Sequence, residues 1–418
     1  MAERVPKKPL WLLWMGACAC FCLAGLAGVL FRGIFVGLSG LSLDAENIRH
    51  GHSHLMVFGW LTPALFVLMT LRMHKRNRGL NLKPFKIVIA LTLGLALLSF
   101  PFFLLYGYGP TPFGGLPLST MISGLSMLAW YGFAGCFLYG SRKMKPGLPL
   151  VLWQGGLFFL FLGSLGAWGI SLLHLTKSAA FFSPKALTHW FLFLFKEGWC
   201  VPALVGLAAC SLGVIELKPH RILAVLLWLG GLPLAVPVGM PAQMMADIFP
   251  YSTRLGMFMV AVGLGQTLLE LIWVCIQKGR YKWLAPLGFL SLKVLALFAA
   301  ALLPLTHLTT HHGVGLLYLH VMLLGGLTLG LVACAFYEGF VLKHFWLFCG
   351  SVLALVASLI PFTPFWPAVW LGRWVWMAAF WLAMPPILCM AAYLVPVPKP
   401  GQEPSALVVL QETGESES

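Results

Sequence analysis

Histidines are concentrated in two short clusters of this chain, and each cluster precedes a long apolar run. The residues are His50, His52 and His54 in the first cluster, His307, His311 and His312 in the second, and His320 inside the run that follows. Ionisable side chains at the start of an apolar helix face the interior of a helix bundle, where they bind a partner or a ligand. Two histidines on separate helices at similar depth are what a haem with two axial protein ligands requires.

The composition is typical of a chain that crosses a bilayer many times. Of the 418 residues, 60% are hydrophobic and 9% are charged. Apolar stretches of about 20 residues or more predict about twelve transmembrane helices. They cover residues 10–38, 53–73, 85–106, 118–140, 149–174, 187–215, 221–241, 252–276, 283–304, 314–337, 344–362 and 369–394. The predicted fold class is all-α, with one twelve-helix membrane domain over residues 1–395 and a short disordered cytoplasmic tail over residues 396–418.

The loops alternate between basic and nearly uncharged, beginning with a basic N-terminus. The basic groups are Arg4, Lys7 and Lys8; Arg72 to Lys86; Arg142 to Lys145; Lys218 and Arg221; Lys278 to Lys282; Lys343; and Lys399. By the positive-inside rule we expect both termini in the cytoplasm and a multi-pass protein of a bacterial-type inner membrane. The net charge of +15 then reflects the basic loops that orient the chain in the membrane. We expect no nucleic-acid partner, because no single basic face is formed.

This topology places nine of the twelve histidines at or near the outer side of the membrane, opposite to the bias of the basic residues. His54 and His320 lie in apolar helical runs at comparable depth. Small residues nearby, Gly59, Gly325 and Gly326, leave room for a flat macrocycle or for another helix. We therefore expect a haem near the outer face, held by His54, His320 or both. The alternative is that both histidines hydrogen-bond neighbouring helices.

The spacing within each cluster limits which histidines can act together. His52 and His54 are two residues apart, so on a helix their side chains point roughly 200° away from each other. Both can serve one site only if His52 precedes the helix. The other cluster offers a second metal site through His307, His311 and His312, since imidazole suits copper. We favour the alternative that these three are interfacial or solvated.

Four ionisable residues are predicted to lie inside the membrane: Lys196 and Glu197 in the sixth span, Glu270 in the eighth and Lys293 in the ninth. Such groups are costly in a bilayer unless they are paired or hydrated. One interpretation is a proton path, with Lys293 and Glu270 on the inner side and Glu197 nearer the histidines. The alternative, which we favour, is structural pairing across helices, for example of Lys293 with Glu270.

The residues around two of these histidines resemble a known family. The segment from His52 to Gly59 is similar to the His-x-His-x-Met-x-Phe-Gly segment of NnrS proteins and to the second span of the haem-copper oxidase subunit I superfamily. The segment from Tyr318 to Gly326 resembles the tenth span of both groups. The resemblance implies twelve spans, a haem, and His54 at the position of the haem ligand in the second span. It also implies an association with the bacterial response to nitric oxide.

Other positions depart from the oxidase pattern. Met322 replaces a second histidine of the tenth span, so the resemblance implies either a single haem or a weaker thioether ligand from Met322. Residues 238–245 hold no histidine where oxidases carry a copper-binding pair. Phe193 stands where nitric oxide reductases have an iron-binding histidine. The second metal that oxygen reduction needs is therefore missing from the pattern.

Three functions follow as hypotheses. The first is a haem-binding membrane protein similar to NnrS, acting in nitric oxide response or haem-linked redox, and not itself classed as an enzyme. Its expected partners are the lipid bilayer and a small diatomic ligand, nitric oxide or oxygen; the haem type and the electron donor are unassigned. The second is a catalytic terminal oxidase or nitric oxide reductase subunit, a haem-dependent oxidoreductase with unusual ligands such as His307, His311 and His312. The third is a secondary transporter whose histidines take part in proton coupling.

Overall fold

The computed structural model describes residues 7–37, 43–176, 183–237, 249–303, 311–340 and 344–394, and every regular element in these ranges is a helix. Eleven helices there are long and apolar enough to cross a membrane. The shorter apolar helix Pro219–Ala235 occupies the place of the seventh predicted span. The prediction of an all-α polytopic membrane protein is therefore confirmed. The predicted disordered tail and the histidine-free stretch 238–245 lie outside the described residues, and the orientation of the termini stays a prediction.

The helices follow one another along the chain, some continuing directly into the next. In chain order they are α1 (Lys7–Phe35), α2 (Ala45–His54), η1 (Leu55–Leu61), α3 (Thr62–Arg76), α4 (Lys83–Tyr106), α5 (Leu118–Ser141), α6 (Leu148–Thr176), α7 (Pro184–Phe193), η2 (Leu194–Cys200), α8 (Val201–Leu212), α9 (Pro219–Ala235), α10 (Phe249–Gln277), η4 (Tyr281–Trp283), α11 (Leu284–Leu302), α13 (His312–His320), η5 (Val321–Thr328), α14 (Leu329–Tyr337), α15 (Phe345–Ala357), η6 (Ile360–Phe362), η7 (Ala368–Trp370), α16 (Arg373–Trp381) and α17 (Met384–Leu394). We call the end of the bundle where α1 begins and α3 ends the basic end. The opposite end, where α1 ends and α2 begins, is the histidine end.

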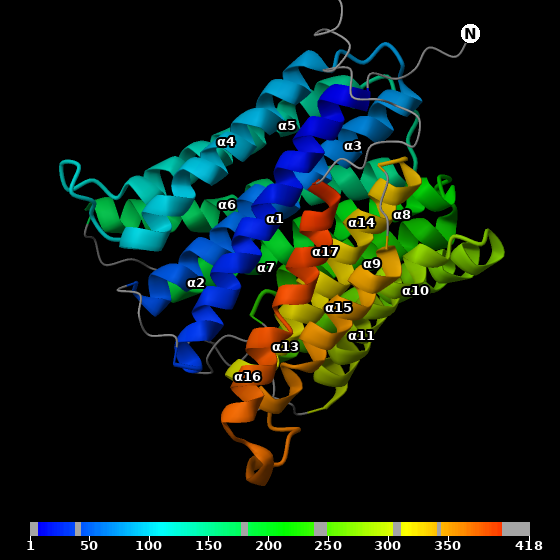
Figure 1. Cartoon of the computed structure of the whole chain (residues 1–418). Coiled ribbons are helices and arrows are strands. Elements are labelled where there is room, and N and C mark those ends of the chain that lie inside the picture. Colours follow the sequence, from blue (N-terminus) through cyan, green and yellow to red (C-terminus); the bar gives the residue numbers. More distant parts are fainter. Residues whose placement is uncertain are drawn as a thin grey trace, which may run out of the picture.

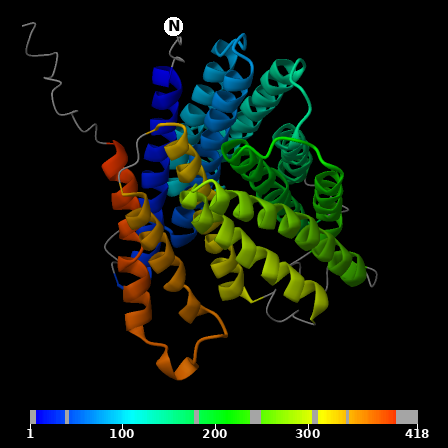
Figure 2. The ribbon, with the colours of Figure 1, turned by 90° about the vertical axis from the view of Figure 1, so that its right-hand side faces the viewer.

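Helices that are neighbours in the chain pack side by side. This holds for α4 with α5 and for α10 with both α9 and α11. The chain then closes on itself, because α17 runs along α1 (Figures 1 and 2). The bundle is thus a single body in which the first and last helices are adjacent.

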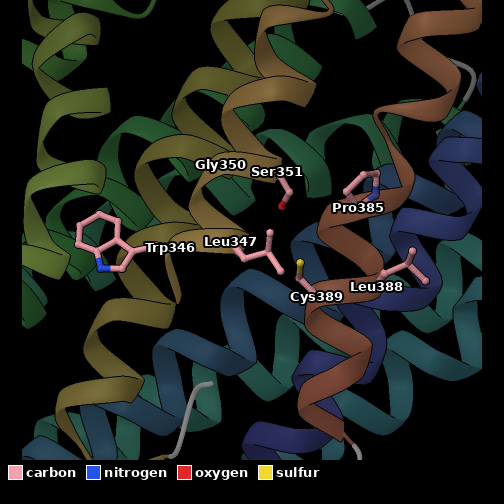
Figure 3. A pocket seen from close by; sticks show the side chains of 7 residues that line it. All are labelled: Trp346, Leu347, Gly350, Ser351, Pro385, Leu388 and Cys389. Carbon is pink, nitrogen blue, oxygen red and sulfur yellow. The ribbon is translucent and has the colours of Figure 1, made fainter. Parts of the chain in front are cut away.

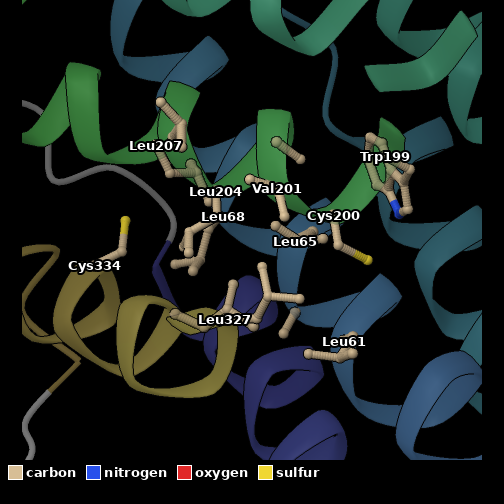
Figure 4. Packing of buried hydrophobic residues seen from close by; sticks show 14 of the residues in the cluster. Leu61, Leu65, Leu68, Trp199, Cys200, Val201, Leu204, Leu207, Leu327 and Cys334 are labelled. Carbon is tan, nitrogen blue, oxygen red and sulfur yellow. The ribbon is translucent and has the colours of Figure 1, made fainter. Parts of the chain in front are cut away.

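Three composite helices form the centre of the bundle. They are the second (α2–η1–α3), the sixth (α7–η2–α8) and the tenth (α13–η5–α14). In their most apolar stretches 89%, 78% and 72% of the residues are buried, against 33–50% in the other eight candidate spans. Figure 4 shows side chains of the three helices packed together, among them Leu61, Leu65, Leu68, Val201, Leu204, Leu207 and Leu327. A helix surrounded by protein is apolar on all sides, so these three lack the polar face that would reveal their orientation.

Each of these central helices contains a π-helical segment. The segments η1, η2 and η5 begin directly after His54, Phe193 and His320, respectively. A π segment is rare and often marks a functional site, because it interrupts the α-helical hydrogen-bond pattern. The indole N–H of Trp60 in η1 donates to the Thr328 hydroxyl in η5 at 3.0 Å. The second and tenth helices are therefore joined directly at the level of their π segments.

A buried ion-pair cluster joins the same two helices at the basic end. The Glu338 side chain, which is fully buried, forms ion pairs with Arg72 and with Lys75, each at 2.5 Å, and Lys75 Nζ also donates a hydrogen bond to its Oε2. Removing one partner from such a cluster leaves an uncompensated charge and costs about 3–5 kcal/mol. The second and tenth helices are thus fixed to each other at both levels.

Candidate functional site

His54 lies on the side of the second helix that faces α4. Its Nε2 is 2.8 Å from the Tyr108 hydroxyl, and its ring stacks on Phe103 with the centroids 3.8 Å apart. Desolvation raises the pKa of Tyr108 to about 12, so the phenol keeps its proton at neutral pH and can donate it to Nε2. His54 Nδ1 has no hydrogen-bond partner in the part of the chain that the structure describes. The Nε2 of His54 is therefore already hydrogen-bonded to Tyr108.

His52 and His320 are held in a different way. His52 Nδ1 is 2.7 Å from the Ala24 carbonyl oxygen, and His320 Nδ1 is 2.8 Å from the Leu316 carbonyl oxygen. A carbonyl can only accept, so the proton of each neutral imidazole is on Nδ1 and the lone pair is on Nε2. Metal-binding histidines are oriented by the same kind of Nδ1–H hydrogen bond to a carbonyl. Both side chains are therefore prepared to bind through Nε2.

Arg32 completes this group from the first helix. It lies within electrostatic reach of both His52 and His320, and the two histidines lie within electrostatic reach of each other. Its Nη1 donates to the Ala379 carbonyl oxygen at 2.6 Å. Arg32 takes part in none of the ion pairs found among the described residues. The Arg32–His52–His320 cluster thus carries a partly buried positive charge that suits an anionic group.

The close approach of α1 to the second helix depends on Gly28. A Cβ atom at this position would come within 2.9 Å of His52 Nδ1. The glycine therefore allows the His52 ring to lie against the α1 backbone and to reach the Ala24 carbonyl. This requirement links a small residue of the first helix to the orientation of the histidine.

The opposite side of α13 carries a second buried polar group. The Tyr318 hydroxyl donates to Glu197 Oε1 at 2.8 Å, and Lys293 Nζ is 2.5 Å from Glu197 Oε2. The side chains of Lys293 and Glu197 are 0% and 5% exposed. Lys196 lies within electrostatic reach of both. We call this set the Tyr318–Glu197–Lys293 network; it joins the sixth, ninth and tenth spans.

The predicted pairing of Lys293 with Glu270 is not formed. Glu270 faces α9, where Arg221 Nε lies 3.0 Å from both of its carboxylate oxygens. A guanidinium that reaches both oxygens gives a stronger and more specific contact than an ammonium. Glu270 is also partly exposed. Lys293 turns instead toward Glu197, so Glu270 does not belong to the network.

Met322 is fully buried in the hydrophobic core, two residues after His320. The structure therefore gives its thioether a packing role, and a role as an iron ligand stays a prediction. Buried methionines commonly fill irregular gaps between helices in this way.

The second histidine cluster is described in part. His311 caps α13, since its Nδ1 accepts from the backbone N–H of Gly313 at 3.1 Å. His312 is exposed, and His307 lies outside the described residues. Within the described ranges there is no group of three or more His, Cys, Asp or Glu side chains that could hold a metal ion. Copper at this cluster stays a prediction.

Arg32 and Tyr318 were not among the site residues predicted from the sequence. A signal for Arg32 exists, because it is the one charged residue between Lys8 and Asp44. For Tyr318 there is no comparable signal, since tyrosine is common near membrane interfaces. Its importance depends on the Glu197 carboxylate, which comes from a distant part of the chain.

Comparison of the chain with protein-family models and with curated proteins found no match. The resemblance to NnrS proteins and to the oxidases is therefore still a prediction. The structure shows two polar groups on opposite sides of the tenth helix, the Arg32–His52–His320 cluster and the Tyr318–Glu197–Lys293 network.

Proposed function

We propose that this protein binds a haem between its second and tenth helices, with His52 and His320 as the protein ligands of the iron. The proposal depends on the tautomer of the two imidazoles, which is the same in both. Both place Nδ1–H on a backbone carbonyl, neither Nε2 has a hydrogen-bond partner among the described residues, and the two rings lie within electrostatic reach of each other. His54 is the weaker candidate, because Tyr108 already engages its Nε2.

Arg32 supports the same proposal through its charge. A haem carries two propionate carboxylates, and a guanidinium is the side chain best shaped to bind a carboxylate. A partly buried cation with no carboxylate partner in the described chain is costly, and a bound carboxylate lowers that cost. The role of Arg32 is to bind and orient this acidic edge.

The proposed activity is haem-linked redox chemistry, including a response to nitric oxide, in a bacterial-type inner membrane with both chain termini in the cytoplasm. When bound, the haem would supply one-electron transfer, and a diatomic ligand would bind its iron only by displacing one of the two histidines. The protein supplies two oriented imidazoles, a positive charge and a central position between tightly packed helices. Two histidine ligands favour electron transfer or sensing over the reduction of oxygen to water.

The test is an optical and electron paramagnetic resonance spectrum of the intact protein after haem-replete expression. We expect a Soret band and the low-spin signature of two histidine ligands. His52→Ala and His320→Ala should each lose most of the bound haem, while the exposed His344→Ala should retain it. Absence of a Soret band from the wild-type protein would refute the proposal.

The Tyr318–Glu197–Lys293 network favours a second candidate, a secondary transporter with proton coupling. Buried carboxylates and lysines inside a membrane bundle are typical of proton-relay paths. The two candidates predict different results in proteoliposomes. A transporter lacks haem and moves protons with its substrate, and Glu197→Gln abolishes that coupling.

A further inference from the structure

Two hollows lie next to each other on the outside of the bundle at the start of α15. One, of about 400 Å³, is at the basic end and is bordered by Lys282, Phe336 and His344. The other, of about 450 Å³, lies between Trp346–Ser351 of α15 and Pro385–Cys389 of α17. Figure 3 shows the side chains of Leu347 and Cys389 directed into this space. Trp346 and Leu347 border both hollows, so the two adjoin at these residues, and we call them together the groove.

The two parts of the groove differ in chemistry. At the basic end, Lys282 Nζ lies 4.1 Å from the Phe336 ring centroid, and no carboxylate pairs with it among the described ion pairs. Along α15 and α17 the walls are apolar, and Leu347 and Leu388 are 63% and 62% exposed. The groove therefore combines an unpaired cation at one end with a strip of apolar surface.

The shape of the apolar part fits a hydrocarbon chain. From Trp346 to Ser351 it follows the helix for about 8 Å at 1.5 Å per residue, running from the basic end toward the middle of the bundle. The space beside Gly350 is open, because a Cβ atom there would meet no other atom within 4 Å. Trp346 is 55% exposed at the mouth, where aromatic rings sit at the level of lipid headgroups.

We propose that this groove binds an anionic phospholipid, with the phosphate at Lys282 and His344 and one acyl chain between α15 and α17. The positive charge selects the headgroup, and the exposed apolar walls select the chain. A soluble phosphate compound would use the cation and leave the apolar walls uncovered. The site is separate from the Arg32–His52–His320 cluster, so it stands independently of haem binding.

The first test is native mass spectrometry of the full-length protein in detergent, titrated with phosphatidylglycerol or phosphatidylcholine of the same acyl chains. A basic residue near the membrane surface is worth about 1 kcal/mol toward anionic lipid, so the wild type should favour phosphatidylglycerol about fivefold. Lys282→Gln should remove this preference. Lys143→Gln makes the same change on an exposed lysine at the same end and should keep it. Equal binding of the two lipids by the wild type would overturn the proposal.

The second test fills the groove. Gly350→Phe places a ring where the acyl chain is proposed to lie, and it should weaken both lipids by about tenfold, as the loss of about two buried methylene groups would. Gly230→Phe is the matched control, since Gly230 on α9 also has open space around its Cβ position. Equal lipid binding by the two variants would show that the chain does not occupy the groove.

Discussion

Tyr318 and His320 are two residues apart on α13 and serve opposite sides of it. Tyr318 donates to Glu197, whereas His320 lies within electrostatic reach of Arg32 and His52. Residues two apart on a helix point roughly 200° away from each other, which is why one short segment can border two polar groups. Any movement of α13 would therefore alter the histidine cluster and the ionic network together.

The two histidines of the second helix should differ in their effect on haem. We expect His52→Ala to lose most of the bound haem, because it removes an imidazole with a free Nε2. His54→Ala should retain most of it, because His54 is bonded to Tyr108. The measurement is the ratio of Soret to protein absorbance in the purified variants. The reverse order would assign the ligand to His54, as the family resemblance implies.

Arg32→Gln should lower the haem reduction potential as well as haem retention. A nearby positive charge stabilises the reduced haem, which has one positive charge less than the oxidised haem. Without that charge the reduction potential should fall on the order of 60 mV, a tenfold shift of a one-electron equilibrium. Arg373→Gln is the control: this arginine is at the same end and donates to the Val36 carbonyl at 3.1 Å. Equal potentials in both variants would remove Arg32 from the site.

Gly28→Ala should disturb the site without touching a polar side chain. Its methyl group would lie within 2.9 Å of His52 Nδ1, so the ring must shift away from the Ala24 carbonyl. We expect weaker haem retention and an altered low-spin electron paramagnetic resonance signal. Gly94→Ala on α4, where the added methyl group meets nothing within 4 Å, should behave as the wild type. An unaltered spectrum for Gly28→Ala would contradict the proposed role of His52.

Glu197→Gln should lower thermal stability, because it leaves the buried Lys293 without its counter-charge. Breaking one partner of a buried pair costs about 3–5 kcal/mol, which is measurable as a drop in the unfolding temperature in detergent. Glu216→Gln makes the same change on an exposed loop residue and should have little effect. The double variant Glu197→Gln with Lys293→Met should recover part of the loss. Similar unfolding temperatures for Glu197→Gln and Glu216→Gln would show that the network does not stabilise the fold.

Thr328→Val should also destabilise the protein, by about 1–3 kcal/mol, because the buried Trp60 N–H loses its acceptor. Thr70→Val is an informative comparison. Within the described chain the Thr70 hydroxyl is buried without a hydrogen-bond partner, so its replacement by an apolar isostere should be neutral or stabilising. The unfolding temperatures of the two variants check both expectations.

The layout of the bundle could be predicted because membrane spans are long apolar runs, and their lengths are visible in the sequence. The accumulation of histidines near one set of helix starts was equally visible. The different surroundings of His52 and His54 were not, because η1, which follows them, is apolar on all sides and does not indicate which side of the helix faces α1 or α4. The partner of Lys293 was also hidden, since Glu197 and Glu270 are both acidic residues of nearby spans and differ in the side of the helix they occupy.

The π segment η1 has a consequence for how this site could change over evolutionary time. A π turn closes its hydrogen bond over one residue more than an α turn, and one residue of an α-helix corresponds to about 100° of rotation. Deleting a single residue between Leu55 and Leu61 would therefore swing the preceding turn, with both of its histidines, around the helix axis. After such a rotation of about 100°, neither His52 nor His54 would keep its present partner, because the two rings lie roughly 200° apart on the helix.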